Sequence, residues 1–314
     1  MTSDIVTVTM NPAIDETVFL GDLRPGAVNR AEHLHRQAGG KGVNVSSMLG
    51  SYGIATIATG FLGKENPELF EQLCAERMIR DEFIRIGGKT RTGIKIVGES
   101  TRETTDINFP GPEPSAADLQ ALRAKLHSLV NPGRWFVVAG SLPVGVSLED
   151  FENLLRLLKR GGAKVAVDTS GPPLQTAITC GVDLIKPNHH ELEEILGHPL
   201  PDSAARVAAA LRLQRENVPR VILSLGGEGA IFAGPEGAFM AQPPPVEVGS
   251  TVGAGDSLLA GYLAGRVTGH TPADCAKLAT AFAWRALENV SRQAPSPAEA
   301  AELMARIMVS PLLA

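Results

Sequence analysis

The chain has 314 residues, of which 44% are hydrophobic, and a formal net charge of −5 with both signs well mixed. A chain of this length can bury the core of one large α/β domain, or of one domain with a smaller appendage. It lacks the basic excess of a nucleic-acid surface, and no apolar run reaches the roughly 18 residues that a membrane span needs. The sequence therefore predicts a protein whose partners are small molecules, not nucleic acid or membrane.

The N-terminus and the cysteines indicate a cytoplasmic protein. The first residues contain an acid and no basic stretch, and their apolar residues alternate with threonine, which is typical of a strand and not of a signal peptide. The cysteines at positions 74, 180 and 275 are an odd number outside any C-x-x-C spacing. This pattern indicates neither a disulfide framework nor a zinc site.

In chain order, short β-branched runs alternate with longer helical patterns. The runs predict strands at 5–9, 135–140, 164–168, 183–187 and 220–226. The longer patterns predict helices at 42–52, 66–76, 115–130, 147–160 and 202–217, and then at 255–267, 272–290 and 296–308. Helices 115–130 and 147–160 open with a serine three residues before an aspartate, as in a capping box. Such repetition predicts a mostly parallel sheet covered by helices on both faces.

Residues 16–37 and 91–110 interrupt this alternation. Both predict strands with polar alternation, without the helical stretches that parallel crossovers require. We therefore expect a small antiparallel sheet, set apart from the main one. Because one face of such a sheet would be exposed, it would serve as a lid over a site or as a dimer contact.

A glycine-rich turn, Gly253-Ala254-Gly255-Asp256, precedes the late helix 255–267. A helix N-terminus offers unpaired N–H groups and partial positive charge, and glycines let an anion approach the backbone. Asp256 would repel a resident phosphate, so it is better suited to orient a neutral hydroxyl that attacks that phosphate. This arrangement is that of a phosphoryl transferase. The alternative is a tight turn whose acid only stabilises the helix dipole.

A second glycine cluster, residues 38–50, contains Gly39 and Gly40 before Lys41, with Asn44 soon after. Small residues allow a sugar to lie against the backbone, while the amide and the ammonium can bond hydroxyls or a phosphate. The alternative is another tight turn with a solvated lysine. The chain contains neither a Walker A pattern nor G-x-G-x-x-G, so the usual P-loop and dinucleotide interpretations fail.

The two clusters, AGGKGVN and STVGAGDSLLAG, occur in that order about 210 residues apart. In this pairing the chain resembles the ribokinase-type (PfkB) carbohydrate kinases, and most closely their 1-phosphofructokinase and tagatose-6-phosphate kinase branch. The likeness extends along the chain through NPAID, FLGKEN, TRTGIKI, GSLPVGV, VDTSG, KPNHHELE and SLGGEGA. It implies one ribokinase-like domain over residues 1–314. This domain would be a three-layer α/β sandwich with a mostly parallel central sheet and an antiparallel lid, formed by about 16–37 and 91–110.

The resemblance also implies roles for residues. Asp256 matches the catalytic base, and Gly253, Ala254 and Gly255 match the anion hole for the phosphoryl group transferred from ATP. Because the transition state of such transfer is loose, a carboxylate with an ordinary or lowered pKa would be sufficient.

On the acceptor side, the resemblance implies that the sugar is bound by Asp15, Gly39, Gly40, Lys41, Asn44 and Ser141. Arg91 would grip the phosphate already present on the substrate. The alternatives are a turn acid after Pro12 for Asp15 and a solvated strand arginine for Arg91.

On the nucleotide side, it implies binding by Lys186, Asn188, Ser224, Gly226, Gly227, Gly229, Ser250 and Thr251. Glu191 would position Mg²⁺ through water, since this cation keeps its waters. A monovalent cation such as K⁺ would bind near Ser250 and Val252. We interpret His189 and His190 as surface residues, because adjacent helical side chains point about 100° apart.

The acceptor is expected to be a phosphosugar. Ser250-Thr251 replaces the Asp-Thr of many sugar kinases, as in the phosphosugar branch. In the first lid strand, Ala27 and Asn29 stand where minor 6-phosphofructokinases carry basic residues, although Arg30 offers a compensating cation. We therefore expect phosphorylation of fructose 1-phosphate at its 6-hydroxyl, with tagatose 6-phosphate or fructose 6-phosphate as alternatives.

The sequence argues against two other classes of protein. A dehydrogenase needs a glycine fingerprint after the first strand, where this chain has NPAID. A non-catalytic sugar-binding regulator is expected to lack Asp256 or its turn, and both are present. A homodimer that forms through the lid sheet would cover the exposed face of that sheet, so we expect such a dimer.

Overall fold

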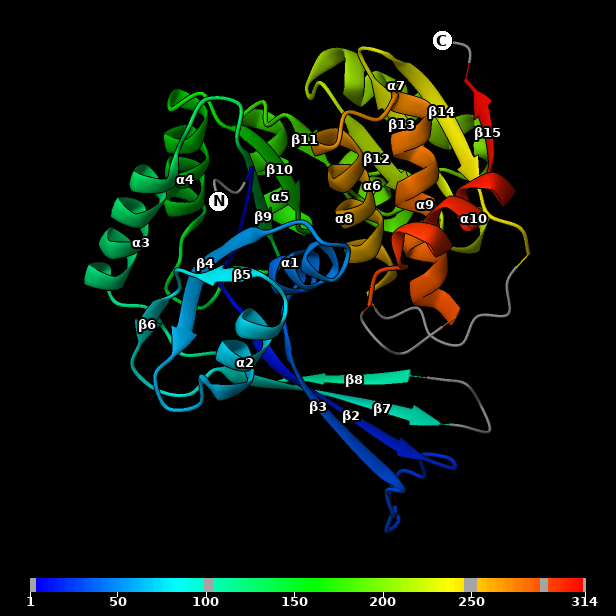
Figure 1. Cartoon of the computed structure of the whole chain (residues 1–314). Coiled ribbons are helices and arrows are strands. Elements are labelled where there is room, and N and C mark those ends of the chain that lie inside the picture. The colour runs from blue at the N-terminus through cyan, green and yellow to red at the C-terminus, as the bar shows by residue number, and fades with distance from the viewer. Residues whose placement is uncertain (1–3, 99–103, 246–252, 289–292, 313–314) are drawn as a thin grey trace.

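The computed structural model describes residues 4–98, 104–245, 253–288 and 293–312, which contain one large and one small sheet (Figure 1). The parallel part of the large sheet comprises β5 (Ile79–Asp81), β4 (Thr56–Gly63), β1 (Ile5–Thr9), β9 (Trp135–Ala139), β10 (Lys164–Asp168), β11 (Leu184–Ile185) and β12 (Val221–Ser224), in that spatial order. β6 (Ile84–Ile86) pairs with β4. Beyond β12 the sheet continues antiparallel through β13 (Ala230–Gly234), β14 (Gly237–Gln242) and β15 (Met308–Pro311).

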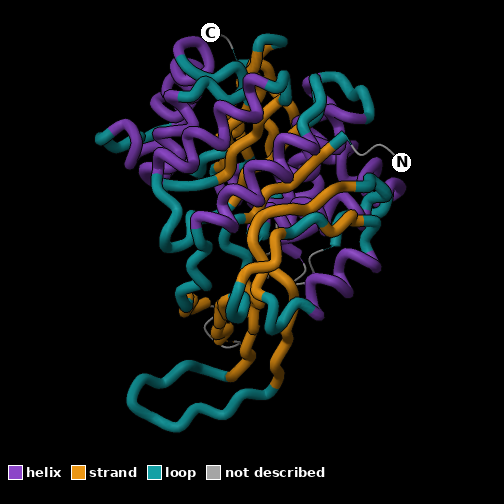
Figure 2. The backbone as a smooth tube through the Cα atoms, turned by 90° about the vertical axis from the view of Figure 1, so that its left-hand side faces the viewer, coloured by secondary structure: helices purple, strands orange, loops and turns teal. Residues whose placement is uncertain are grey.

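Helices cover both faces of this sheet (Figures 1 and 2). One buried apolar cluster includes residues of α3 (Ala116–Leu129), α4 (Leu148–Arg160), α5 (Gly171–Thr179), α6 (His189–Leu196) and α7 (Ser203–Glu216). A second includes residues of α1 (Lys41–Ser51), α8 (Ala254–Val267), α9 (Pro272–Glu288) and α10 (Pro297–Arg306). β1 contributes Val6 and Val8 to the first cluster and Ile5 to the second. The predicted three-layer α/β architecture is therefore confirmed.

Local sequence signals locate most element boundaries. The capping boxes of Ser115 with Asp118 and of Ser147 with Asp150 begin α3 and α4, as predicted. The last predicted helix is too long, because α10 ends at Arg306 and Met308 begins β15. This segment pairs with the open edge of β14, and that pairing overrides the local helical pattern. No described helix has the length and apolar character needed to cross a membrane.

The small sheet has the order β3 (His33–Gly39), β2 (Ala13–Leu20), β7 (Arg91–Gly98) and β8 (Thr104–Asn108). Its outer pairs are antiparallel, but β2 and β7 are parallel. The prediction of a purely antiparallel sheet is therefore wrong for the central pair. The parallel crossover does exist, but it runs through α1, β4 and α2 (Glu68–Glu76) instead of through one local helix. In Figure 2 the sheet projects from the body of the protein, with the β2–β3 connection at its far end.

The two faces of the small sheet differ in polarity. Residues opposite each other on paired strands share a face. By this register, one face includes Asp15, Thr17, His35, Gln37 and Lys95. The other includes Val18, Leu34, Ile94, Ile96 and Ile107. Near the base of this apolar face, α2 packs on the sheet in a cluster that includes Ile14, Ala38 and Phe70.

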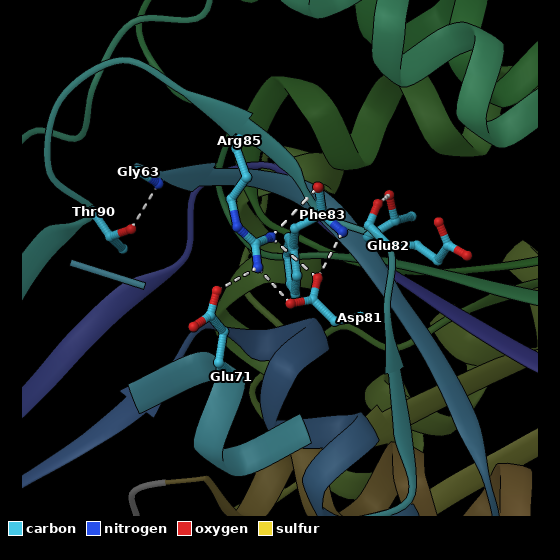
Figure 3. Close-up of polar contacts among 8 residues, drawn as sticks. Gly63, Glu71, Asp81, Glu82, Phe83, Arg85 and Thr90 are labelled. Atoms are coloured by element: carbon cyan, nitrogen blue, oxygen red, sulfur yellow. Dashed lines mark hydrogen bonds and ion pairs between the residues drawn. The ribbon is translucent and has the colours of Figure 1, made fainter. Parts of the chain in front are cut away.

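A polar network fixes the short strands next to the start of β7 (Figure 3). The guanidinium of Arg85 in β6 bridges Asp81 in β5 and Glu71 in α2. Gly63 at the end of β4 donates its N–H to Thr90 Oγ1 at 2.9 Å, and a Cβ at this glycine would clash with the Thr90 backbone nitrogen. This close approach fixes the backbone immediately before Arg91.

Candidate active site

A cavity of about 730 Å³ lies among the ends of β11 and β12 and the helices α1, α6, α8 and α9. Its predicted lining residues are Lys41, Lys186, Asn188, Glu191, Ser224, Gly226, Gly227, Gly229, Gly253, Ala254, Gly255 and Asp256. The structure thus brings the nucleotide-side residues together with the late glycine turn. Ser250, Thr251 and Val252 lie outside the described residues.

The N-terminus of α8 is suited to bind an anion. The helix begins at Ala254 after Gly253, which has a φ of 79°, and the described structure contains no side-chain cap there. A Cβ on Gly255 would lie 3.1 Å from Lys186 Nζ. Glycine therefore admits the ammonium of Lys186 to a helix end that already favours negative charge.

Asp256 is buried in the first turn of α8, with 7% of its surface exposed. Its Oδ2 accepts a hydrogen bond of 2.6 Å from Asn44 Nδ2 on α1, so the two glycine clusters meet at this contact. Burial and the charge of Asp168 raise the pKa of Asp256, against the opposing effects of Lys41, Asn44 and Lys186. An ordinary or lowered pKa would be sufficient for a loose transition state, but the pKa of Asp256 is raised because desolvation outweighs the stabilising groups.

Sequence reasoning missed Asp168, a fully buried acid at the end of β10. Lys41 Nζ lies 2.8 Å from its Oδ1, and Lys186 Nζ lies 3.2 Å from its Oδ2. Burial opposes ionisation, yet the two lysines hold the pKa of Asp168 below its ordinary value. Desolvation likewise opposes charge on Lys41, but Asp168 and Asp256 raise the pKa of this lysine. The position of Asp168 was a usable signal, because ligands bind beyond the carboxyl ends of parallel strands.

The predicted sugar residues form a neighbouring group at the base of the small sheet. Asp15 on β2 is buried, and a Cβ on Gly39 would lie 2.5 Å from its Oδ2. Gly40, with a φ of 112°, immediately precedes α1, whose first turns contain Lys41 and Asn44. Lys95 on β7 is a further residue of this group that was not predicted. Its Nζ lies 3.1 Å from Asp15 Oδ1. The polar alternation of β7 alone does not distinguish this lysine from a solvated one.

Arg91 and Ser141 are linked through Asn11. Arg91 Nη1 donates to Asn108 Oδ1 at 3.2 Å, and Nη2 donates to the Asn11 carbonyl at 3.5 Å. The Asn11 amide donates to Ser141 Oγ at 3.0 Å. Burial lowers the pKa of Arg91, and Asp15 opposes this effect. Arg91 is therefore a half-buried group facing polar neighbours, unlike the solvated strand arginine of the alternative.

The nucleotide side has a rigid polar rim and an apolar wall. Asn188 and Glu191 form a capping box at the start of α6, and Ser224 donates its N–H to the Pro187 carbonyl at 3.0 Å. A 3₁₀ turn, Gly226–Glu228, follows β12, and Gly229 comes next with a φ of 98°. Further residues line the cavity without having been predicted from the sequence: His189, His190, Pro243, Leu258, Thr280, Ala283, Trp284 and Leu287. The lining residues on α9 recur at the spacing of residues that face an ordinary helix core. Their sequence pattern therefore contains no separate functional signal.

The residues present can assist a hydrated metal ion but cannot enclose one. In the part of the chain that the structure describes, no three His, Cys, Asp or Glu side chains are grouped as a metal site. Glu191 lines the cavity and accepts the Asn188 N–H at 2.9 Å through Oε2. A single carboxylate fits Mg²⁺, which keeps several waters and takes its other ligands from substrate phosphates.

A helix end suited to an anion lies beside a buried acid that can orient a hydroxyl, and this combination is typical of a phosphotransferase. The class can be stated more narrowly from known proteins. The chain belongs to the pfkB family of carbohydrate kinases, whose model matches residues 8–299.

Relatives and solved structures agree with this assignment. The chain is 40% identical to a 1-phosphofructokinase of Xanthomonas campestris, over 98% of this chain and 99% of the relative. It is 35% identical to that of Escherichia coli K12, over 99% of both. Phosphofructokinase-2 from Escherichia coli, solved with substrates and products, matches with a TM-score of 0.90 and 26% identity over 96% of this chain and 98% of that one. The ribokinase-like architecture is thereby confirmed.

Proposed function

We propose that this kinase transfers the γ-phosphoryl group of ATP to the 6-hydroxyl of fructose 1-phosphate, giving fructose 1,6-bisphosphate and ADP. The observation that carries the proposal is the position of Asp256, which is fixed by Asn44 at the anion-binding end of α8. The 1-phosphofructokinases at 35% and 40% identity support the choice of acceptor. Tagatose 6-phosphate and fructose 6-phosphate are the alternative acceptors.

In the chemical step, Asp256 accepts the proton of the 6-hydroxyl as the new O–P bond forms. The bond from the γ-phosphorus to the bridging oxygen breaks, and ADP leaves with that electron pair. The amides of Ala254 and Gly255, together with Lys41 and Lys186, stabilise the charge on the transferring group. Asp168 is a positioning residue, since its buried carboxylate holds both lysines in place.

The acceptor lies between the polar face of the small sheet and the start of α1. Asp15, with the backbone at Gly39 and Gly40, bonds the sugar hydroxyls, and Arg91 grips the 1-phosphate beside Ser141. The small sheet then serves as the lid of the site. The links from Arg91 through Asn11 to Ser141 support this placement.

The nucleotide occupies the 730 Å³ cavity, with its base against the apolar side chains of α9. Asn188, Ser224 and the glycine turn 226–229 bind its polar edge. Glu191 would hold a hydrated Mg²⁺ through water, and the ion would neutralise charge on the phosphates when bound. Phosphofructokinase-2 from Escherichia coli has been solved with potassium, which supports a K⁺ site near Ser250 and Val252.

The test is a coupled ADP-release assay across fructose 1-phosphate, fructose 6-phosphate, tagatose 6-phosphate, fructose and ribose. Fructose 1-phosphate should give the highest kcat/KM. Asp256→Asn should lower kcat roughly 10³-fold while ATP still binds, and Asp274→Asn, in the first turn of α9, should leave it unchanged. A near-normal rate for Asp256→Asn, or a better acceptor elsewhere in the panel, would disprove the corresponding part of the proposal.

We also propose that the chain forms a homodimer through the small sheet. Leu34 and Ile107 on its apolar face are 57% and 44% exposed, and a second copy of this face would cover them. A solved form of phosphofructokinase-2 from Escherichia coli is tetrameric.

A further inference from the structure

A second cavity of about 340 Å³ lies beside the edge strand of the small sheet. It is bounded by β3, α1 and α2, and its lining includes His35, Gln37, Asn44, Ser47, Gln72 and Arg77. Amide and hydroxyl groups alternate there with Leu69 and Leu73. Such a lining suits a small polyol. The hydroxyls of the polyol can hydrogen-bond the polar side chains, while its carbon atoms contact the leucines.

The guanidinium of Arg77 gives this cavity its positive charge. Arg77 Nε is buried and has no hydrogen-bond partner within the described ranges. Buried polar groups are almost always bonded, so this nitrogen indicates a missing partner. By contrast, Arg36 at the rim already pairs with Glu16 at 2.9 Å, and Glu76 accepts from Gln72 at 2.8 Å.

The backbone of Arg77 is held firmly in place. A Cβ on Gly50 of α1 would clash with the Arg77 carbonyl, so the two segments are in close contact. The next residue, Met78, has a φ of 55°, a conformation uncommon for a side chain of this kind. An arginine fixed in this way loses little freedom when it binds, and its planar fork matches the oxygens of a phosphate.

The cavity shares Asn44 with the proposed acceptor position, but Arg77 lies apart from the proposed phosphate position of the acceptor. Arg91 lies on β7, whereas the cavity lies beyond β3, with β2 between these two strands. A sugar whose phosphate is held by Arg91 therefore does not place that phosphate on Arg77. The cavity nevertheless adjoins the catalytic centre, because Asn44 lines it and donates to Asp256 at 2.6 Å.

We infer that this cavity binds a second sugar phosphate, distinct from the acceptor, with its phosphate on Arg77. Its occupancy acts on catalysis through Asn44, a step that rests on the proposed role of Asp256. The ligand class is a phosphate monoester of a small polyol, and fructose 1-phosphate itself belongs to this class.

Calorimetric titration of the full chain with fructose 1-phosphate, without ATP, tests the site. We expect two molecules per chain for the wild type and for the control Arg80→Gln, whose residue pairs with Glu82 away from the cavity. Arg77→Gln should weaken one of the two sites roughly tenfold to hundredfold. His35→Glu, at an exposed strand position, should do the same by repelling the phosphate. A single site in every variant overturns the inference, as does a loss of acceptor binding itself in Arg77→Gln.

Initial rates test the link to catalysis. In the wild type, the rate should depart from a simple saturation curve at high fructose 1-phosphate, and Arg77→Gln should abolish the departure without changing KM at low concentration. Identical curves for both proteins would disprove the link through Asn44. Arg77-dependent binding without any turnover of fructose 1-phosphate would contradict the proposed function alone and leave the cavity assignment standing.

Discussion

At the residue scale, the proposed role of the buried carboxylate of Asp256 predicts how activity depends on pH. Burial and Asp168 raise its pKa, and the base must be ionised to accept a proton. The acid limb of kcat/KM for the acceptor should therefore have its midpoint above about 3.9, the ordinary value for aspartate. Asn44 favours the ionised form, so Asn44→Ala should move this limb to still higher pH. A pH–rate profile measures both effects, and a limb unmoved by Asn44→Ala would contradict the assignment.

Asp168 also contributes to stability, because it is the shared partner of two lysines. Asp168→Asn removes its charge and leaves Lys41 and Lys186 close together. Removing one member of a buried charged group typically costs about 3–5 kcal/mol, so we expect a loss of this size in the free energy of unfolding, with a fall in kcat. Urea denaturation measures the loss. As a control, Glu152→Gln breaks an exposed pair on α4 and should stay within about 0.5 kcal/mol of the wild type; an equally small effect for Asp168→Asn would refute the prediction.

The sequence identified some site residues and missed others for a physical reason. Asp256, Lys41 and Asn44 lie within glycine clusters, which are rare in helices unless backbone must approach a ligand or another chain segment. Asp168 ends an ordinary buried strand, and Trp284 belongs to a helix whose pattern is that of core. Their roles depend on contacts between distant segments, which no local pattern contains.

At the element scale, α8 and α9 are in close contact through small residues. A Cβ on Gly261 would lie 2.7 Å from the Leu278 carbonyl oxygen and 2.8 Å from Ala279 Cα. Alanine is favoured over glycine in a helix by about 1 kcal/mol, but overpacking costs about 1–3 kcal/mol and here meets backbone atoms. Gly261→Ala should therefore lower the free energy of unfolding, as measured by urea denaturation. Gly87→Ala, where a Cβ meets nothing within 4 Å, is the control, and a stabilised Gly261→Ala protein would show that the helices separate easily.

Element boundaries that depend on local contacts were predicted well, whereas two pairings between distant strands were not. The helices with capping boxes begin at their serines because the cap needs only residues three apart. β15 and the parallel pairing of β2 with β7 depend on strands far away in the chain. Local periodicity contains no information about such partners.

At the scale of the whole molecule, the proposed homodimer depends on the apolar face of the small sheet. The combined change Leu34→Lys and Ile107→Lys places charge on this face. Sedimentation analysis should give a dimer for the wild type and a monomer for the double variant. Val144→Lys, at a residue that is 62% exposed in the loop before α4, should remain dimeric. A monomeric wild type, or a double variant that still dimerises, would exclude this interface.

The parallel pairing of β2 with β7 also constrains how the chain folds. The loop that this pairing closes includes α1, β4 and α2, so its entropic cost is met only once those elements have packed. On a ribosome, the first hairpin would emerge long before its partner strand. The surface proposed to receive the sugar is therefore completed late, after much of the scaffold beneath it. A nascent chain halted before residue 91 would lack part of the proposed acceptor site.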